Sequence, residues 1–419
     1  MWSNIGVQPG GEQSFTLIEL LIVIGIVAIL SVGVVLTLNP AELLKQARDS
    51  RRLADTAILD RAINTLLVET SDIGTPNTVY VSIPDPTLPP GGTSNCPDAN
   101  MPEDLPSLPS GWVYQCVASS DLTKVDGTGW VPANFQSFSA GAPLSVLPVD
   151  PINTVASGYY YTYVSGGSYV TTAALESQKF IAQTAREDGG TDPTRVEQGS
   201  NLKLWRDASG LIGWWPFDEG SALTAADASG KGNNGTLVNG PLWVGGKVGS
   251  ALSFDNLDDY VSIPDSDSLF ATNTISIMAW VKRKTDGGGD AIYGDDDGAL
   301  PHPEYSLLFL DVGGKKIRFQ TNHLGSNPRT AETLAGTPVA GVWAHVAFTW
   351  DGSNIKFYVD GANTATSPAG ATVWQGAVDY RIGRKPDNTA PFDGLIDEVR
   401  VYRRRLSGIE IQQIYNATK

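Results

Sequence analysis

The sequence has few cysteines, few histidines and no excess of basic residues. Of its 419 residues, two are cysteine and three are histidine, and 29 lysines and arginines stand against 45 aspartates and glutamates. The net charge is −16, and both halves of the chain are acidic, so no nucleic acid binding is predicted and anionic membrane surfaces are poor partners. With 41% hydrophobic residues, the chain is long enough for two or three domains, each with its own core.

The two cysteines, Cys96 and Cys116, have no histidine nearby, so they cannot complete a tetrahedral zinc site. Closing the loop of about 20 residues between them is worth about 3 kcal/mol if they are oxidised. We predict a disulfide. The alternative is two free thiols without a structural role.

The longest apolar segment runs from Phe15 to Leu38 and contains one acidic residue, Glu19. As a helix it reaches about 36 Å, more than the roughly 30 Å of hydrocarbon in a bilayer, so it can span a membrane. A carboxylate inside such a span costs about 2.5 to 3.5 kcal/mol on insertion scales. We therefore expect Glu19 to have a partner.

The run SFTLIEL, from Ser14 to Leu20, resembles the leader and mature N-terminus of type IV pilins and type II secretion pseudopilins. The resemblance implies that a prepilin peptidase cuts between Ser14 and Phe15 and that the new amine of Phe15 is methylated. It also implies that Glu19 pairs with the amine of a neighbouring subunit during assembly. Ser14 replaces the glycine usual before the cut, and residues 1–14 lack the usual basic residue.

The resemblance also implies a location and partners. Residues 1–14 would be the leader, residues 15–38 a single span of the cytoplasmic (inner) membrane, and the later domains extracytoplasmic, with the protein in a cell-surface pilus after assembly. The implied partners are other pilin subunits in a homo- or hetero-polymer, the prepilin peptidase and assembly machinery, and the inner membrane before assembly. Lys45 and Arg48 favour the opposite orientation by the positive-inside rule, but Glu42 and Asp49 interleave with them.

Residues 39–206 are expected to form an α+β pilin domain, in which a long helix packs on a small antiparallel sheet. The helix pattern continues after Pro40 to about residue 70 and offers two apolar rows, one through Leu43, Ala47, Ala54, Ile58, Ala62 and Leu66 and one through Leu59, Ile63, Leu66 and Leu67. The runs at 159–164 and 168–172, joined by Ser-Gly-Gly, predict a β-hairpin. Residues 207–210 are predicted to be a linker.

Residues 211–419 show the period of two that is typical of strands, with Asp-Gly turn signals at 351–352 and 360–361. They also contain, in order, the segments GLIGWWPFDEG, ALSFD, YVSIP, WAHVA, YVDG and GLIDEVRVY. This ordered set resembles the laminin G-like, concanavalin A-like jelly-roll family. We therefore expect an all-β jelly-roll sandwich of two antiparallel sheets.

One acidic residue interrupts the last strand of this domain. In the alternation Leu395, Asp397, Val399, Val401, the carboxylate is expected to point inward, where it must be paired or bound to a cation. The family resemblance implies a structural calcium, with Asp218 and Asp397 as candidate ligands. The alternative is that Asp397 accepts hydrogen bonds from backbone N–H groups. No other cofactor is expected.

Catalysis is not expected. Some concanavalin A-like relatives are glycosidases that place carboxylates at alternate positions on one strand. This chain has no such cluster, and its histidines are scattered, so we predict that it is not an enzyme. Glycans are the ligand that the resemblance suggests, with Trp374 and Tyr305 as candidate stacking residues.

The resulting hypothesis is a structural subunit of a type IV pilus-like surface filament that displays a lectin-like jelly roll for adhesion or glycan binding. Three alternatives remain open. The chain is a pseudopilin of a type II secretion or DNA-uptake system, an unprocessed membrane-anchored binding protein, or a degenerate hydrolase. Fold alone does not decide among them.

Overall fold

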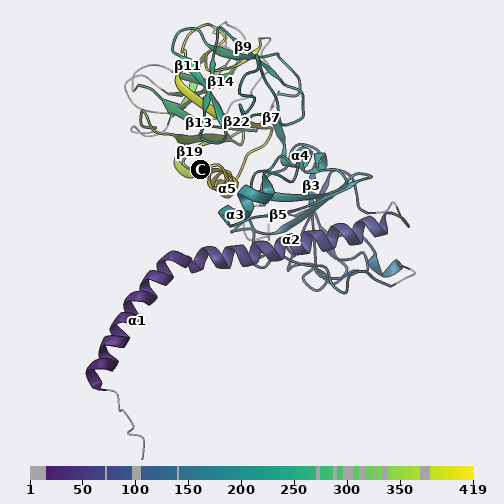
Figure 1. The fold of residues 1–419 in the computed structure, drawn as a ribbon. Coiled ribbons are helices and arrows are strands. Elements are labelled where there is room, and N and C mark those ends of the chain that lie inside the picture. The colour runs from purple at the N-terminus through teal and green to yellow at the C-terminus, as the bar shows by residue number, and fades with distance from the viewer. Residues whose placement is uncertain are drawn as a thin grey trace, which may run out of the picture.

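The computed structural model consists of a bent N-terminal helical segment, a head built on a six-stranded sheet, and a β-sandwich (Figure 1). We call the second part the head and the third part the sandwich. The structure describes residues 16–70, 73–96, 105–138, 141–269, 274–285, 290–295, 305–310, 317–323, 326–332, 338–368 and 378–419.

Two helices open the chain, α1 (Leu17–Leu38) and α2 (Pro40–Leu66). Asn39 separates them with φ of 38°, a left-handed conformation that asparagine tolerates better than most residues. The Asn39 side chain accepts a hydrogen bond from the N–H of Glu42, and Pro40 takes the first helical position, where no N–H donor is needed. The chain therefore bends between the two helices (Figure 1).

Helix α2 packs on the sheet of the head. The second of the two predicted apolar rows forms the contact, since Leu59, Ile63 and Leu66 are buried. Leu43 and Ile58 of the first row are exposed. Nearer its N-terminus the same face of α2 buries polar residues instead, and these are Asp49, Arg52 and Thr56.

The sheet of the head has the strand order β2-β3-β1-β4-β5-β6. Its strands β1 and β3 pair in parallel, so the prediction of an antiparallel sheet was wrong for this pair. Parallel pairing joins segments that are distant in sequence, which no local pattern indicates. The predicted hairpin is confirmed as β4 and β5. The strands are β1 (Thr78–Val81), β2 (Thr93–Ser94), β3 (Val113–Val117), β4 (Tyr161–Ser165), β5 (Tyr169–Ala174) and β6 (Arg195–Gly199).

Short helical turns complete the head. Besides η1 (Phe135–Ser137), these are α3 (Gln178–Phe180), the π-helical turn η2 (Ile181–Ala185) and α4 (Lys203–Ser209). The face of the sheet opposite α2 packs against α4 through Trp205 and Ala208. Residues 207–210, expected to be a linker, are the end of α4 and its cap Gly210.

The sandwich consists of two antiparallel sheets. One contains β10-β11-β22-β13-β18-β19-β20, with β7 paired to β22, and we call it the proximal sheet because it contacts the head. The other, the distal sheet, has the order β17-β16-β15-β14-β21-β12-β9-β8. The proximal strands are β7 (Leu211–Trp215), β10 (Leu242–Gly245), β11 (Ser250–Asp255), β13 (Ile275–Arg283), β18 (Ala344–Trp350), β19 (Asn354–Val359), β20 (Ala362–Pro368) and β22 (Asp393–Tyr402). The distal strands are β8 (Thr224–Ala225), β9 (Gly235–Val238), β12 (Tyr260–Ile263), β14 (Asp290–Gly294), β15 (Tyr305–Leu310), β16 (Ile317–His323), β17 (Ser326–Glu332) and β21 (Tyr380–Ile382).

An apolar core lies between the two sheets. The side chains of strand β22 that face this core change from even-numbered to odd-numbered residues along the strand. Ile396 faces the core before an irregularity in the strand, and Val399 and Val401 face it afterwards. The pairing of β22 with β13 shifts at this place, and Glu398 has φ of 53°. A bulge of this kind exchanges the two faces of a strand.

The chain ends in helix α5 (Gly408–Thr418), which follows the last strand. Ser407 caps the helix, and the Glu410 side chain bonds back to the Ser407 N–H, which completes a capping box. Helix α5 lies between the sandwich and the head (Figure 1).

Candidate functional sites

The N-terminal motif begins helix α1. Its first residues, Ser14 and Phe15, lie outside the described residues. Thr16 donates two hydrogen bonds to Oε2 of Glu19, from its N–H at 2.9 Å and its hydroxyl at 2.8 Å, and the Glu19 N–H donates to the Thr16 hydroxyl. The helix start is thus a capping box, and it holds the Glu19 carboxylate against Thr16.

The apolar side chains in the first half of α1 are exposed. Each of the following is more than half exposed: Leu17, Ile18, Leu20, Leu21, Ile22, Val23, Ile24, Ile26 and Val27. The side chains of residues 28–38 lie outside the described part. Over the residues that the structure does describe, the hydropathy and length of the helices do not reach those of a membrane span.

The two cysteines form the predicted disulfide. Cys96 follows β2 and Cys116 lies in β3, the strand paired with β2, and both are buried. Their Cα atoms are 5.8 Å apart, within the usual range for a bridge. The bond ties the end of the edge strand β2 to β3, the next strand of the head's sheet.

Asp397 is fully buried, but not in the core of the sandwich. It lies at the bulge of β22, opposite Trp280 on the outer side of the proximal sheet. The prediction that it shares the inward face of Val399 was therefore wrong, because the bulge reverses the alternation before Val399. Its Oδ2 accepts hydrogen bonds from the N–H groups of Lys247 and Val248 at 2.8 and 2.9 Å.

The second oxygen of Asp397, Oδ1, is buried and has no hydrogen-bond partner. Burial, together with the charges of Glu398 and Asp218, raises the pKa of Asp397 to about 7. Asp218 binds the same turn, since its Oδ1 accepts from the N–H of Ser250 at 2.8 Å, and burial also raises its pKa. The structure thus brings the two predicted ligands to one turn. Asp397 accepts hydrogen bonds from backbone N–H groups, as the alternative for this residue expected.

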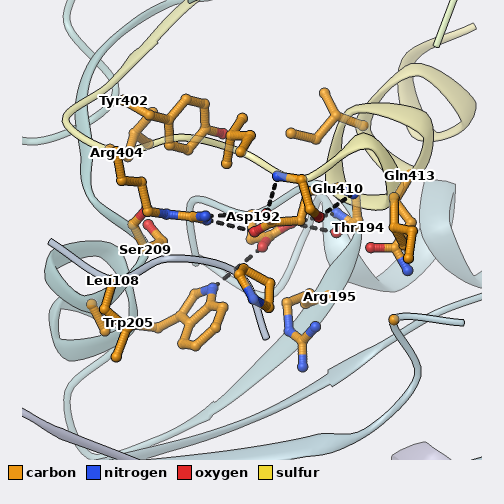
Figure 2. Close-up of a pocket in the computed structure, with 18 of the residues that line it drawn as sticks. Leu108, Asp192, Thr194, Arg195, Trp205, Ser209, Tyr402, Arg404, Glu410 and Gln413 are labelled. Carbon is orange, nitrogen blue, oxygen red and sulfur yellow. Dashed lines mark hydrogen bonds and ion pairs between the residues drawn. The ribbon is translucent and has the colours of Figure 1, made fainter. Parts of the chain in front are cut away.

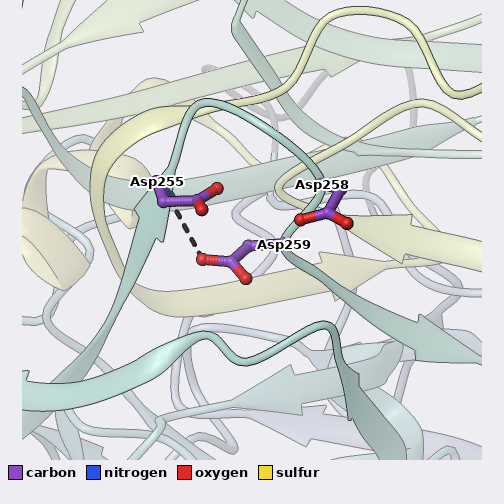
Figure 3. A group of neighbouring side chains, drawn as sticks. All are labelled: Asp255, Asp258 and Asp259. Carbon is purple, nitrogen blue, oxygen red and sulfur yellow. Dashed lines mark hydrogen bonds between the residues drawn. The ribbon is translucent and has the colours of Figure 1, made fainter.

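A second acidic group lies at the end of β11 (Figure 3). Carboxylate oxygens of Asp255, Asp258 and Asp259 all lie within 4.8 Å of one another, so the group could hold a metal ion. Asp255 and Asp258 are exposed and Asp259 is buried. Sequence reasoning missed this group, although three aspartates within five residues were visible. Oxygen ligands of this kind suit calcium better than a transition metal.

The side chains of the two predicted stacking residues lie outside the described part of the structure. Trp374 lies outside the described residues. Tyr305 begins β15, but its side chain also lies outside the described part.

His345 is described and is buried. Its ring packs against Trp280 and Tyr415, and burial lowers its pKa to about 3. An imidazole that stays neutral down to such acidity, with no access to solvent, is poorly placed to act as a general base.

Two carboxylates close the loop between η2 and β6. Oε1 of Glu197 accepts from the N–H groups of Thr191 and Asp192, both at 2.8 Å, while Asp188 accepts from the N–H of Glu197 at 2.6 Å. Burial raises the pKa of Glu197 to about 8, and the charges of Asp192 and Asp188 add to the effect. Burial likewise raises the pKa of Asp188 to about 6. Sequence reasoning gave no role to these residues.

This loop borders a crevice between the head and the sandwich (Figure 2). Trp205, Arg195 and Asp192 line it from the head, and Tyr402, Arg404 and Glu410 line it from the sandwich side. Its volume of about 50 Å³ has room for a few water molecules but not for a sugar ring. The crevice lies at the contact between the head and the sandwich.

Comparison with known proteins matches two segments of the chain. Residues 11–35 match the prokaryotic N-terminal methylation motif, and residues 254–412 match the concanavalin A-like lectin/glucanases superfamily. The chain carries a prepilin-type methylation motif and a C-terminal concanavalin A-like, laminin G-type domain. The motif implies processing by a prepilin peptidase, pilus-type assembly, anchoring in the inner membrane before assembly and an extracytoplasmic location.

One curated relative is adhesion G-protein coupled receptor V1 of Danio rerio, which is 27% identical over 155 residues, 35% of this chain. The chain spans about 2% of that relative's length. Similar solved structures include domain 4 of an extracellular arabinanase of Geobacillus stearothermophilus in complex with arabinotriose, at 22% identity and a TM-score of 0.42 over 49% of this chain and 97% of that one. The binding domain of Paraclostridial Mosquitocidal Protein 1 has 13% identity and a TM-score of 0.40 over 49% and 52%. The sialidase of Trypanosoma rangeli has 15% identity and a TM-score of 0.38 over 61% and 44%. These similarities assign no ligand to the chain.

Proposed function

We propose that the chain is a structural subunit of a type IV pilus-like surface filament and that its sandwich binds glycans outside the cell. The observation that supports the proposal is the methylation motif at the start of a helix whose described apolar side chains, from Leu17 to Val27, are each more than half exposed. Such a row of exposed side chains is stable in lipid or against helices of other subunits. The sandwich then supplies the binding function.

In the proposed assembly, Ser14, Phe15 and Glu19 of the motif act in successive steps. The peptidase cuts between Ser14 and Phe15, and Phe15 becomes the methylated N-terminus. Glu19 offers its carboxylate to the amine of a neighbouring subunit, which compensates both charges in a low-dielectric surrounding. Both hydrogen bonds from Thr16 use Oε2 of Glu19, so the carboxylate is oriented before the partner arrives.

The finer features of the sandwich are proposed with it. Asp397 and Asp218 are the preferred calcium ligands, because a buried Oδ1 without a hydrogen-bond partner is the kind of oxygen that a cation stabilises. Trp374 and Tyr305 remain the proposed stacking residues, and loss of glycan binding in the Trp374→Ala protein is the test for the first of them. The sandwich is proposed to bind without cleaving, so release of sugar from a polysaccharide panel would contradict this part.

The proposal is tested on filaments sheared from native cells. Mass spectrometry of this protein is expected to find a peptide that begins with N-methylated Phe15. A protein found only in membranes, with residues 1–14 still attached, would instead make it an anchored binding protein. A processed protein that never leaves the periplasmic space as a filament would favour a pseudopilin of a secretion or DNA-uptake system.

A further inference from the structure

Helix α5 covers the outer face of the proximal sheet. The contact is an apolar cluster of side chains from the helix, from the segment before it and from the sheet: Leu211, Met278, Ala347, Tyr358, Tyr402, Leu406, Ile411 and Ile414. At 11 residues the helix is too short to be stable alone in water, so its order depends on this packing.

The C-terminal end of α5 is bound by the head. Gln178 donates from Nε2 to the carbonyl of Asn416 at 2.9 Å, and the Arg186 guanidinium donates to the carbonyl of Ala417. These bonds satisfy carbonyl groups that a helix leaves without partners at its C-terminus. The side chain of Ala417 belongs to the apolar core cluster of the head. One helix therefore packs on the outer face of the sandwich and also contributes a side chain to the core of the head.

The N-terminal end of α5 is held at the domain junction. The Arg404 guanidinium forms two hydrogen bonds with the Glu410 carboxylate, at 2.6 and 3.1 Å, and donates a third to the carbonyl of Ser209 in α4. Nearby, the hydroxyl of Ser107 in the head donates to the carbonyl of Arg405 at 2.8 Å. Both ends of the helix are thus fixed to the head.

The head also approaches the middle of α5 closely. A Cβ atom at Gly158 would lie 2.8 Å from Nε2 of Gln413 and 2.8 Å from Cγ2 of Ile409. Since real Cβ atoms do not approach heavy atoms so closely, a larger residue at Gly158 requires the Gln413 and Ile409 side chains of α5 to move, and its φ of 73° disfavours any residue other than glycine. The crevice beside this contact is the small one shown in Figure 2.

The covalent connection between the two domains is a single residue, Gly210. Helix α4 ends at Ser209, Gly210 caps it with φ of 73°, and β7 begins at Leu211. The carbonyl of Gly210 accepts a hydrogen bond from the N–H of Arg403 at 2.8 Å. A hinge needs a few residues that are able to change their backbone angles, and here these residues are held by hydrogen bonds.

We infer that α5 is a clamp that holds the sandwich on the head in one orientation. Domains joined by a small polar interface usually move relative to each other, whereas this interface has apolar, ionic and main-chain contacts along a whole helix. On the filament function proposed above, on which this consequence rests, each subunit turns its distal sheet away from the head at the same angle (Figure 1). Because α5 covers the outer face of the proximal sheet, the distal sheet and its loops are the part of the sandwich that binds a surface glycan.

The test uses the full chain in detergent micelles and trypsin, which cuts after Lys203 and Arg206 in α4. The wild type is expected to resist cleavage at both bonds. Gly158→Val, which drives a side chain into α5, is expected to be cut about tenfold faster, because cleavage follows the population of the opened form. Gly167→Val is the matched control, since Gly167 has φ of 79° but faces open space. Thermal scans check that both domains remain folded.

A second variant, with its own control, tests the inference in case the Gly158→Val protein misfolds. The Gln178→Ala/Arg186→Ala protein loses the two hydrogen bonds to the C-terminal end of α5, and Lys179→Ala is its control. Cleavage of the folded wild type at the junction, or equal rates for each variant and its control, would overturn the clamp. The measurement needs no filament, so absence of filaments from cells would contradict the proposed function without changing this result.

Discussion

Arg52 and Asp150 form a bidentate ion pair inside the head. Nε of Arg52 donates to Oδ2 of Asp150 at 2.6 Å, and Nη2 of Arg52 donates to Oδ1 of Asp150 at 3.0 Å. Asp49 and Glu176 bind the same guanidinium through Nη1, at 2.8 and 2.5 Å. Arg52, Asp49 and Asp150 are almost completely buried. The network joins helix α2 to the segments before β4 and after β5, and so sets the position of the helix on the sheet.

We expect Arg52→Ala to destabilise the head by about 3 to 5 kcal/mol, because it leaves buried carboxylates without their counter-ion. Arg51→Ala is the control. The exposed Arg51 places its Nε 3.6 Å from Oδ2 of the partly buried Asp55, and an ion pair with a solvent-exposed partner contributes about 0 to 1 kcal/mol. Urea unfolding followed by circular dichroism measures both changes. Similar midpoints for the two variants would show that the buried network does not stabilise the head.

The disulfide is expected to stabilise the head by about 3 kcal/mol, since it closes a loop of 20 residues. The Cys96→Ser/Cys116→Ser protein should therefore unfold at lower urea than the oxidised wild type. Reductant should lower the wild-type midpoint to nearly that of the variant and should leave the variant unchanged. A wild type that is insensitive to reductant would contradict the prediction.

The pKa of Glu197, raised to about 8 chiefly by burial, predicts a pH dependence of stability. The native state keeps this proton up to about pH 8, whereas the unfolded chain loses it near its ordinary pKa of 4.5. The native state therefore binds more protons between these values, and stability falls as pH rises from about 4.5 to 8.

The Glu197→Gln protein should lack this contribution. Relative to wild type, its melting temperature is expected to be higher at pH 8.5 than at pH 5, because glutamine imitates the protonated acid at both. Glu187→Gln, at an exposed position, is the control and should follow wild type. A constant difference between Glu197→Gln and wild type across this range would refute the shift.

Calcium is expected to raise the melting temperature of the wild type, and a chelator should reverse the change. At a calcium concentration of 100 times the Kd, the stabilisation is about 2.7 kcal/mol. Asp397→Asn should abolish the effect and Asp258→Asn should preserve it. The reverse result would assign the metal to the group of Asp255, Asp258 and Asp259, and no shift in the wild type would remove calcium from the account.

Glu19→Ala is expected to abolish surface filaments while the protein still reaches the membrane, because the change removes the carboxylate and keeps the apolar helix. Glu69→Ala, at an exposed glutamate after α2, should assemble as wild type does. Electron microscopy of sheared material and immunoblotting of membranes measure the two outcomes. Normal filaments with Glu19→Ala would show that the carboxylate is not used in assembly.

Local patterns predicted much of the fold. The hairpin of β4 and β5, the disulfide and the two-sheet sandwich each follow from residues close in sequence or from an ordered set of motifs. The parallel pairing of β1 with β3 did not follow, since nothing local relates residue 78 to residue 113. The bulge at Asp397 was also missed. A bulge changes which face of the strand the side chains address, but on each side of it the sequence still alternates with a period of two.

The sequence by itself determined the N-terminal helix with its single carboxylate and the two kinds of domain, because hydropathy and period are properties of neighbouring residues. Only the tertiary structure decided which face of α2 is buried, because the sheet selects it. It also decided that Asp397 and Asp218 bind one turn and that α5 joins both domains. These last features depend on contacts between residues far apart in the chain, where packing rather than local preference sets the free energy.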